Sequence, residues 1–164
     1  MEDKEYNDLD IALLEQAIEL SGWSASKEGS LVGGPFGAII TDSNGNIIGQ
    51  AINNVLNACD PTAHAEIVAI RMACSVTHSN SLENCTLYSS CEPCPMCLMA
   101  CKWAGINKIY FAATRKDAAR IGFQDEALYK ILKRGKYAIP VKECRKSAIK
   151  QMRKWKKKYA DITY

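Results

Sequence analysis

Two short motifs, each at the expected start of a helix, restrict the possible folds of this chain more than any other feature. The first is His64-Ala65-Glu66, which follows Pro61-Thr62 and opens a helical pattern. The second is Pro93-Cys94-Pro95-Met96-Cys97, in which Pro95 suits the first turn of a helix. Two facing helix starts can bring one imidazole and two thiols to a single point. The motifs therefore favour a fold in which these two helices begin close together.

The residue types in the two motifs are typical of a catalytic zinc site. Structural zinc sites usually fill four positions with protein ligands, whereas catalytic sites keep one position open. His64, Cys94 and Cys97 supply three ligands, so we expect one zinc ion per chain. Zinc lowers the pKa of a water molecule toward about 7, and Glu66 is placed to move its proton. The first motif alone has a simpler explanation, with His64 in a capping or packing role and Glu66 as a first-turn acid. A Cys-x-x-Cys at a helix start can alone be a redox pair, half of a zinc site or a set of cluster ligands.

Composition indicates one folded domain. The chain has 164 residues, of which 48% are hydrophobic and 24% are charged, so we expect a single domain over 1–164. No uncharged apolar run approaches the roughly 18 residues of a membrane span, and the acidic start MEDKEYNDLD does not resemble an export signal. Eight cysteines without such a signal indicate a reducing compartment. We therefore expect a cytoplasmic protein.

Hydrophobic periodicity predicts alternating helices and strands. We expect a helix over 9–20, a hairpin of strands 37–41 and 47–55, a helix over 63–72, a strand over 86–89, a helix over 95–103, a strand over 108–113, a helical region over 117–133, a strand over 139–143 and a helix over 147–159. This alternation favours an α/β fold, in which helices pack on the faces of a sheet.

The two motifs match the H-x-E and P-C-x-x-C signature of the zinc-dependent nucleobase deaminases. Longer stretches resemble the bacterial guanine deaminases of the cytidine deaminase-like fold: Gly33-Gly-Pro-Phe-Gly-Ala38, Asn53-Asn54, Asp60-Pro-Thr-Ala-His-Ala-Glu66, Ser90-Cys-Glu-Pro-Cys-Pro-Met-Cys-Leu98 and Gly122-Phe-Gln-Asp125-Glu. The resemblance covers about residues 9–133 plus Tyr164. It implies a three-layer α/β/α sandwich with a mixed five-stranded sheet, a homodimer, and hydrolysis of guanine to xanthine and ammonia.

The same resemblance implies a role for each matching residue. His64, Cys94 and Cys97 correspond to the zinc ligands and Glu66 to the proton shuttle. The implied substrate-binding residues are Asn53, Phe36, Trp103, Ala65, Asp125 and Tyr164. The amide of Asn53 would hydrogen-bond the purine, Phe36 and Trp103 would form aromatic walls, and Asp125 would hydrogen-bond the edge of guanine. Tyr164 would lie on a tail that is exchanged between subunits and covers the partner's pocket. From the residues alone, Phe36 and Trp103 are more typical of a protein core.

Two further deaminase activities fit the same motifs. A guanosine deaminase would resemble this sequence in much the same places. A tRNA adenosine deaminase is suggested by the basic C-terminal segment of about 145–164, which has 8 Lys/Arg against 1 Asp/Glu, whereas residues 1–144 have 13 against 17. However, apolar residues recur at helical spacing in this segment, at Ile149, Met152, Trp155 and Tyr159. We therefore interpret the segment as an amphipathic helix whose basic face is exposed to solvent. We therefore expect a small-molecule purine substrate rather than nucleic acid.

A different class of protein is suggested by four cysteines at 91, 94, 97 and 101. Their spacing matches a bacterial ferredoxin run that binds an iron-sulfur cluster. The proline expected after the last cysteine is replaced by Lys102, and no second run exists. We therefore interpret Cys91 and Cys101 as small buried residues, the common fate of free cysteines.

Overall fold

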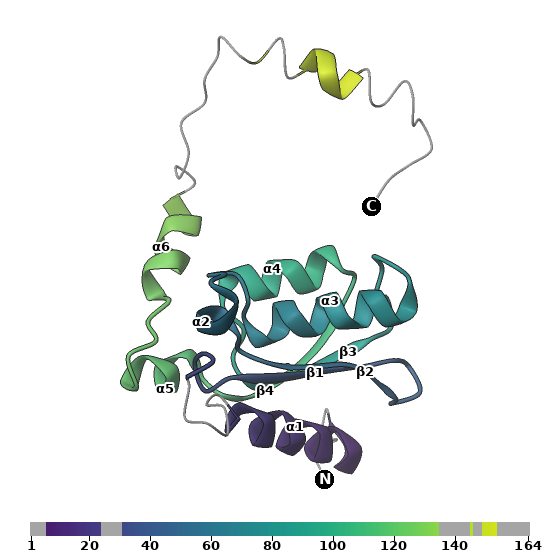
Figure 1. Cartoon of the computed structure of the whole chain (residues 1–164), viewed down its shortest axis with the longest axis vertical. Coiled ribbons are helices and arrows are strands. Elements are labelled where there is room, and N and C mark those ends of the chain that lie inside the picture. Colours follow the sequence, from purple (N-terminus) through teal and green to yellow (C-terminus); the bar gives the residue numbers. More distant parts are fainter. Residues whose placement is uncertain (1–5, 24–30, 135–144, 146–148, 154–164) are drawn as a thin grey trace. The chain divides into compact units, whose positions relative to one another are not determined.

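The computed structural model describes residues 6–23, 31–134, 145 and 149–153. It divides into two compact units, Met1–Asp125 and Glu126–Tyr164. The first unit contains, in order, α1 (Asp8–Ser21), β1 (Gly37–Thr41), β2 (Ile47–Ile52), α2 (Val55–Ala58), α3 (Ala65–Thr77), β3 (Thr86–Cys91), α4 (Pro95–Trp103), β4 (Lys108–Ala113) and α5 (Arg115–Arg120) (Figure 1). The second unit contains α6 (Glu126–Arg134), and residues 149–153 are also helical.

The strands form one mixed sheet in the order β2-β1-β3-β4. β1 pairs antiparallel with β2 and with β3, whereas β3 and β4 run parallel. Every residue of β1 is buried, as expected for a central strand that is covered on both faces. The mixed sheet and its helices confirm the predicted α/β class. Four strands lie within the described residues, and the strand predicted over 139–143 falls outside them.

Helices cover both faces of the sheet, with α1 on one side and α3 and α4 on the other (Figure 1). Ile39 of β1 and Tyr88 of β3 pack against Leu13 and Ala17 of α1. Their strand neighbours point the opposite way, because successive side chains of a strand alternate between faces. That second face supplies Ala38, Ile40 and Leu87 to a core with Ala65, Ala69 and Ala73 of α3.

Small residues allow α3 to approach the sheet closely. Ala65, Ala69 and Ala73 recur every fourth position, so they form one continuous stripe, and none of them is exposed. A side chain at Gly49 of β2 would collide with the carbonyl oxygen of Ala69. This close packing brings the first turn of α3 to the end of the sheet where β3 leads into α4.

The predicted helices and strands that lie within the described residues are confirmed with differences at several ends, and the strand predicted over 86–89 continues to Cys91. The strand predicted to end at residue 55 stops at Ile52, where Asn53 turns back to donate its backbone N–H to Phe36, and the short α2 follows. The helix predicted over 63–72 continues to Thr77 and ends at His78, which adopts φ +51°. The helical region predicted over 117–133 is two helices, α5 and α6, with Gly122 at φ +99° between them. The helix predicted over 147–159 is described only at 149–153.

Among the residues that the structure describes, none of the helices combines the length and the apolar character needed to span a membrane.

Candidate metal centre

The three predicted ligands occupy equivalent places at two helix starts. His64 is the N-cap residue of α3 and Cys94 is the N-cap residue of α4, and both have extended backbone conformations. Neither side chain caps its own helix, so both are directed elsewhere. Pro95 begins α4 as predicted, and Cys97 lies in the first turn of that helix. The capping explanation for the His64 side chain is therefore wrong.

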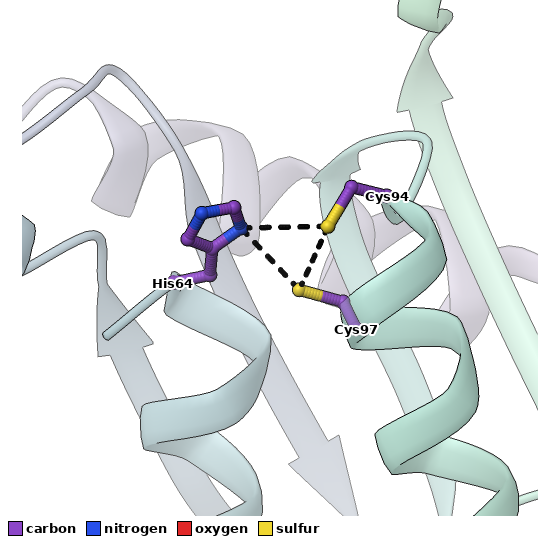
Figure 2. A group of neighbouring side chains, drawn as sticks. All are labelled: His64, Cys94 and Cys97. Atoms are coloured by element: carbon purple, nitrogen blue, oxygen red, sulfur yellow. Dashed lines mark hydrogen bonds between the residues drawn. The ribbon is translucent and has the colours of Figure 1, made fainter. Parts of the chain in front are cut away.

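The three ligand atoms form a nearly equilateral triangle (Figure 2). His64 Nδ1 lies 3.6 Å from Cys94 Sγ and 3.5 Å from Cys97 Sγ, and the two sulfur atoms lie 3.6 Å apart. Tetrahedral zinc has bonds of about 2.3 Å to sulfur and about 2.05 Å to nitrogen, which places ligand atoms about 3.6 to 3.8 Å from one another. The donor set and its dimensions therefore fit one zinc ion.

Contacts among the three side chains lower the pKa of one thiol and raise the pKa of the other thiol and of the imidazole. The hydrogen bond from Cys97 lowers the pKa of Cys94 to about 4, with a further contribution from His64. The same hydrogen bond and burial raise the pKa of Cys97, and the contact with Cys94 raises that of His64. Thiols bind zinc as thiolates, so a metal ion would displace the proton that these groups share. Cys97 is buried, whereas His64 and Cys94 are half-buried, which leaves one side of the group open.

Glu66 lies beside the ligands without being one of them. Its side chain is 6% exposed, and Oε2 lies 3.5 Å from Cys97 Sγ. Burial is the main cause that raises the pKa of this carboxyl group above its ordinary value. A carboxyl group with a raised pKa can both take and give a proton near neutral pH. The arrangement supports the predicted role of Glu66 in proton transfer.

Asn53 is 5% exposed and immediately follows β2. Its Oδ1 accepts hydrogen bonds from the backbone N–H groups of Gly34, at 3.1 Å, and Val55, at 3.3 Å. A side chain at Gly33 would collide with Asn53, so the glycines allow the loop to close around this amide. These contacts orient the side chain with its oxygen toward the backbone, which leaves Nδ2 as the group that can donate to a ligand.

The other predicted pocket residues differ in their placement. Phe36 is half-buried and contacts Phe123 edge to face, with ring centroids 5.0 Å apart. Ala65 is fully buried between His64 and Glu66 in the chain. Asp125 is partly buried, and its pKa is raised by burial and by the nearby charges of Cys94 and Glu92, which places it near the second motif. Tyr164 lies outside the described residues.

Trp103 is 77% exposed, so its interpretation as a core residue is wrong. It ends α4, whereas the ligand Cys94 precedes the same helix. Nine helical residues rise by roughly 13 Å, so the structure does not bring Trp103 to the ligands of its own chain. Its role as a pocket wall remains a prediction.

Sequence reasoning missed two residues that support the site. Glu92 Oε2 accepts a hydrogen bond of 3.0 Å from the backbone N–H of Arg115, which ties the loop before α4 to the start of α5. Ser89 of β3 donates from Oγ to Glu66 Oε1 over 3.2 Å. The sequence does contain one signal for Ser89. Side chains alternate between the two faces of β3, so Ser89 is expected on the same buried face as the core residue Leu87.

The geometry does not gather the four cysteines of the ferredoxin-like run. Cys101 is fully buried in the core beneath α3, and Cys91 donates to the carbonyl oxygen of Thr114 over 3.7 Å. Within the described part of the chain, the group that could hold a metal consists of His64, Cys94 and Cys97. Cys91 and Cys101 are small buried residues, as predicted.

Helices on both faces of a mixed sheet, with a His/Cys/Cys group and a buried glutamate at two helix starts, define a zinc-binding deaminase architecture. Residues 8–113 match the family model of the cytidine and deoxycytidylate deaminase zinc-binding region. The chain belongs to this family.

Sequence similarity to curated relatives covers part of the chain, whereas a structural match covers nearly all of it. It is 52% identical over 99 residues to guanine deaminase from Bacillus subtilis, covering 60% of this chain and 63% of that protein's length. The crystal structure of B. subtilis guanine deaminase superposes with a TM-score of 0.79, covering 97% of this chain and 99% of the other at 37% identity. A tRNA-specific adenosine deaminase from Aquifex aeolicus is 46% identical over 82 residues, covering 50% of this chain and 54% of that protein.

Proposed function

We propose that the protein is a zinc-dependent guanine deaminase, which converts guanine and water to xanthine and ammonia. The observation that carries this proposal is the triangle of His64, Cys94 and Cys97 with the Glu66 carboxyl group beside it. The likeness to B. subtilis guanine deaminase, whose crystal structure superposes over 97% of this chain, supports guanine as the substrate.

Zinc held by His64, Cys94 and Cys97 would supply an activated water molecule to the site. Glu66 takes a proton from this water and delivers it to the ring nitrogen; it then takes the proton of the new hydroxyl group on the ring carbon and gives it to the departing amine, as that hydroxyl becomes the carbonyl group of xanthine. The water oxygen forms a bond with the ring carbon that bears the amino group, and the bond from that carbon to the amine breaks. No oxidant or reductant is needed, because the reaction is a hydrolysis.

The residues around the ligands account for purine binding. Asn53 Nδ2 donates to an acceptor on the purine, because Oδ1 is already held by two backbone N–H groups. Asp125 accepts from the N–H groups of the guanine edge, and Phe36 forms an aromatic wall. An amide donor paired with a carboxylate acceptor matches guanine, which carries both a carbonyl group and N–H groups.

We propose that the enzyme acts as a homodimer in which the C-terminal tail, ending at Tyr164, closes the partner's pocket. The exposed Trp103 and Met99, one turn apart on α4, support a surface that a second copy covers. Deleting residues 161–164 should weaken guanine binding and slow turnover while zinc content and folding stay normal. Unchanged kcat/KM in the shortened dimer would refute the lid role of Tyr164.

We further propose that 1–164 forms one deaminase domain, in which about 145–164 are a basic C-terminal helix and tail, and that the protein works in the cytoplasm. Nucleic acid is not its substrate. Phosphate contacts by several Lys and Arg residues would make binding fall steeply with salt, so binding of an anticodon stem-loop is measured at physiological salt. Tight binding with deamination would favour the tRNA adenosine deaminase activity instead.

The test of substrate is ammonia release from guanine, guanosine, adenine, cytosine and an anticodon stem-loop, each incubated with zinc-loaded protein. We expect the highest kcat/KM with guanine. A clear preference for guanosine would show that the pocket accepts the ribose and that the enzyme acts on nucleosides.

A further inference from the structure

Ser89 is a buried hydroxyl outside both zinc-site motifs. It lies on β3, is 2% exposed, and donates a hydrogen bond of 3.2 Å from Oγ to Glu66 Oε1. Ala38, its partner across the sheet on β1, is also fully buried. A polar side chain in this apolar layer is costly unless it has a specific partner. The Glu66 carboxyl group is that partner.

The two oxygen atoms of Glu66 have different surroundings. Oε1 faces β3 and accepts from Ser89, whereas Oε2 faces the ligand group and lies 3.5 Å from Cys97 Sγ. The carboxyl group therefore has a rear oxygen, Oε1, held by the sheet, and a front oxygen, Oε2, directed at the place where the chemistry occurs.

Metal binding removes one side-chain hydrogen bond of the Glu66 carboxyl group and keeps the one from Ser89. Cys97 binds a metal as a thiolate, which has no hydrogen to donate to Oε2. The hydrogen bond from Ser89 then still holds Oε1, beside the contact of the carboxyl group with the backbone N–H of Glu66 itself. Catalytic hydrogen bonds of this length commonly shorten once the substrate binds.

We propose that Ser89 is a positioning residue for Glu66: it fixes the rear oxygen Oε1, so that Oε2 takes and gives the proton. Ser89 keeps its own proton throughout and does not touch the substrate. The proton from water passes to Oε2 and then to the purine ring nitrogen; Oε2 next takes the proton of the new hydroxyl group on the ring carbon and gives it to the departing amine. This inference rests on the proposed deaminase function and adds a residue that neither motif contains.

The kinetic test compares Ser89→Ala with two related variants. We expect Ser89→Ala to lower kcat for guanine by roughly 10- to 100-fold, with KM changed less than about threefold and zinc content unchanged. Ser89→Thr keeps a hydroxyl group and should recover most of kcat. Ser90→Ala is the matched control, since Ser90 accepts from the Gly37 N–H over 2.9 Å and lies on the opposite face of β3. It should keep kcat within about twofold.

A coupling measurement separates positioning from a general structural effect. If Ser89 acts only through Glu66, then Ser89→Ala should cause no further loss of kcat in a protein that already carries Glu66→Ala. A further loss as large as that in the wild-type background would show that Ser89 acts through something other than Glu66, and would overturn the proposal.

Crystal structures of the zinc-loaded proteins test the same relationship without a substrate. In the wild type, Glu66 should adopt one rotamer with Oε1 on Ser89, and in Ser89→Ala it should adopt several rotamers or turn away. An unmoved Glu66 in Ser89→Ala, or full kcat in that variant, overturns the proposal. A wild type that does not deaminate guanine would refute the proposed function alone, because the Glu66 rotamer can still be compared.

Discussion

The hydroxyl group of Tyr88, on β3, donates a hydrogen bond of 2.7 Å to the buried carboxylate of Asp10, on α1. The same Asp10 closes a capping box with Asn7 at the start of α1. This one carboxylate therefore fixes where α1 begins and how it sits on the face of the sheet opposite the metal centre.

Tyr88→Phe should destabilise the protein without affecting zinc binding. The variant keeps the ring that stacks on Tyr110 but removes the hydroxyl group that donates over 2.7 Å to the buried carboxylate of Asp10. Loss of a partner from a buried charged group costs about 1–3 kcal/mol, which a urea unfolding curve can measure. Asp8→Asn, which removes an exposed carboxylate from the same helix turn, should change stability little.

Stability should fall at acid pH in a way that depends on Asp10. Burial works to raise the pKa of Asp10, but hydrogen bonds from Asn7 and Tyr88 outweigh it and lower the pKa. A lowered pKa in the folded state means that this stabilisation is complete above about pH 4 and is lost as pH falls through the folded pKa. The difference in unfolding free energy between wild type and Asp10→Asn should shrink on going from pH 6 to pH 3. A constant difference would refute this role of Asp10.

Glu66→Gln should keep the metal and lose turnover. The amide retains the shape of the side chain and can still accept from Ser89, but it cannot transfer a proton. One general acid or base commonly contributes about 10²- to 10⁴-fold, so kcat for guanine should fall by that factor. Zinc content measured by atomic absorption provides the control, and near wild-type turnover would remove Glu66 from the mechanism.

Cys94→Ala should abolish stable zinc binding, because it removes one of three ligand atoms and leaves two. Cys59→Ala is a matched control that removes an exposed cysteine from outside the ligand group. Zinc is measured in both proteins after dialysis. Full occupancy in Cys94→Ala would show that the ligand assignment is wrong.

Asn53→Asp should separate the role of the amide oxygen of Asn53 from the role of its amide nitrogen. The carboxylate keeps an oxygen for the backbone N–H groups of Gly34 and Val55, but it replaces the Nδ2 donor with a second acceptor. A lost donor of this kind should lower kcat/KM for guanine by roughly 10- to 100-fold. Asn57→Ala, at an exposed position of α2, is the control. Equal kcat/KM in Asn53→Asp and the wild type would exclude a contact between Nδ2 and the purine.

The sequence could predict that the side chains of the candidate metal centre lie close together because local spacing encodes them. His64, Glu66, Cys94 and Cys97 lie in two motifs at helix starts, and each motif sets its own geometry once its helix forms. The four described strands and α4 were predicted with errors of a few residues at their ends, because their periodicity and their turn residues agree.

Contacts between distant elements could not be predicted in this way. The bond from Ser89 to Glu66 joins residues 23 apart in the sequence, and the bond from Tyr88 to Asp10 joins residues 78 apart. Both depend on how α1 and α3 pack on β3, which no local pattern specifies. Trp103 was interpreted as a core residue because of its type, yet its place at the end of α4 leaves it exposed.

Zinc titration of metal-free protein, followed by ammonia release from guanine, tests whether the protein is a zinc-dependent guanine deaminase. We expect that ammonia and xanthine form in equal amounts, that activity rises in proportion to bound zinc, and that it stops rising at one zinc ion per chain. Cys94→Ala should remain inactive throughout the same titration. Zinc-loaded wild-type protein that releases no ammonia from guanine, or metal-free protein that releases it at full rate, would contradict the account.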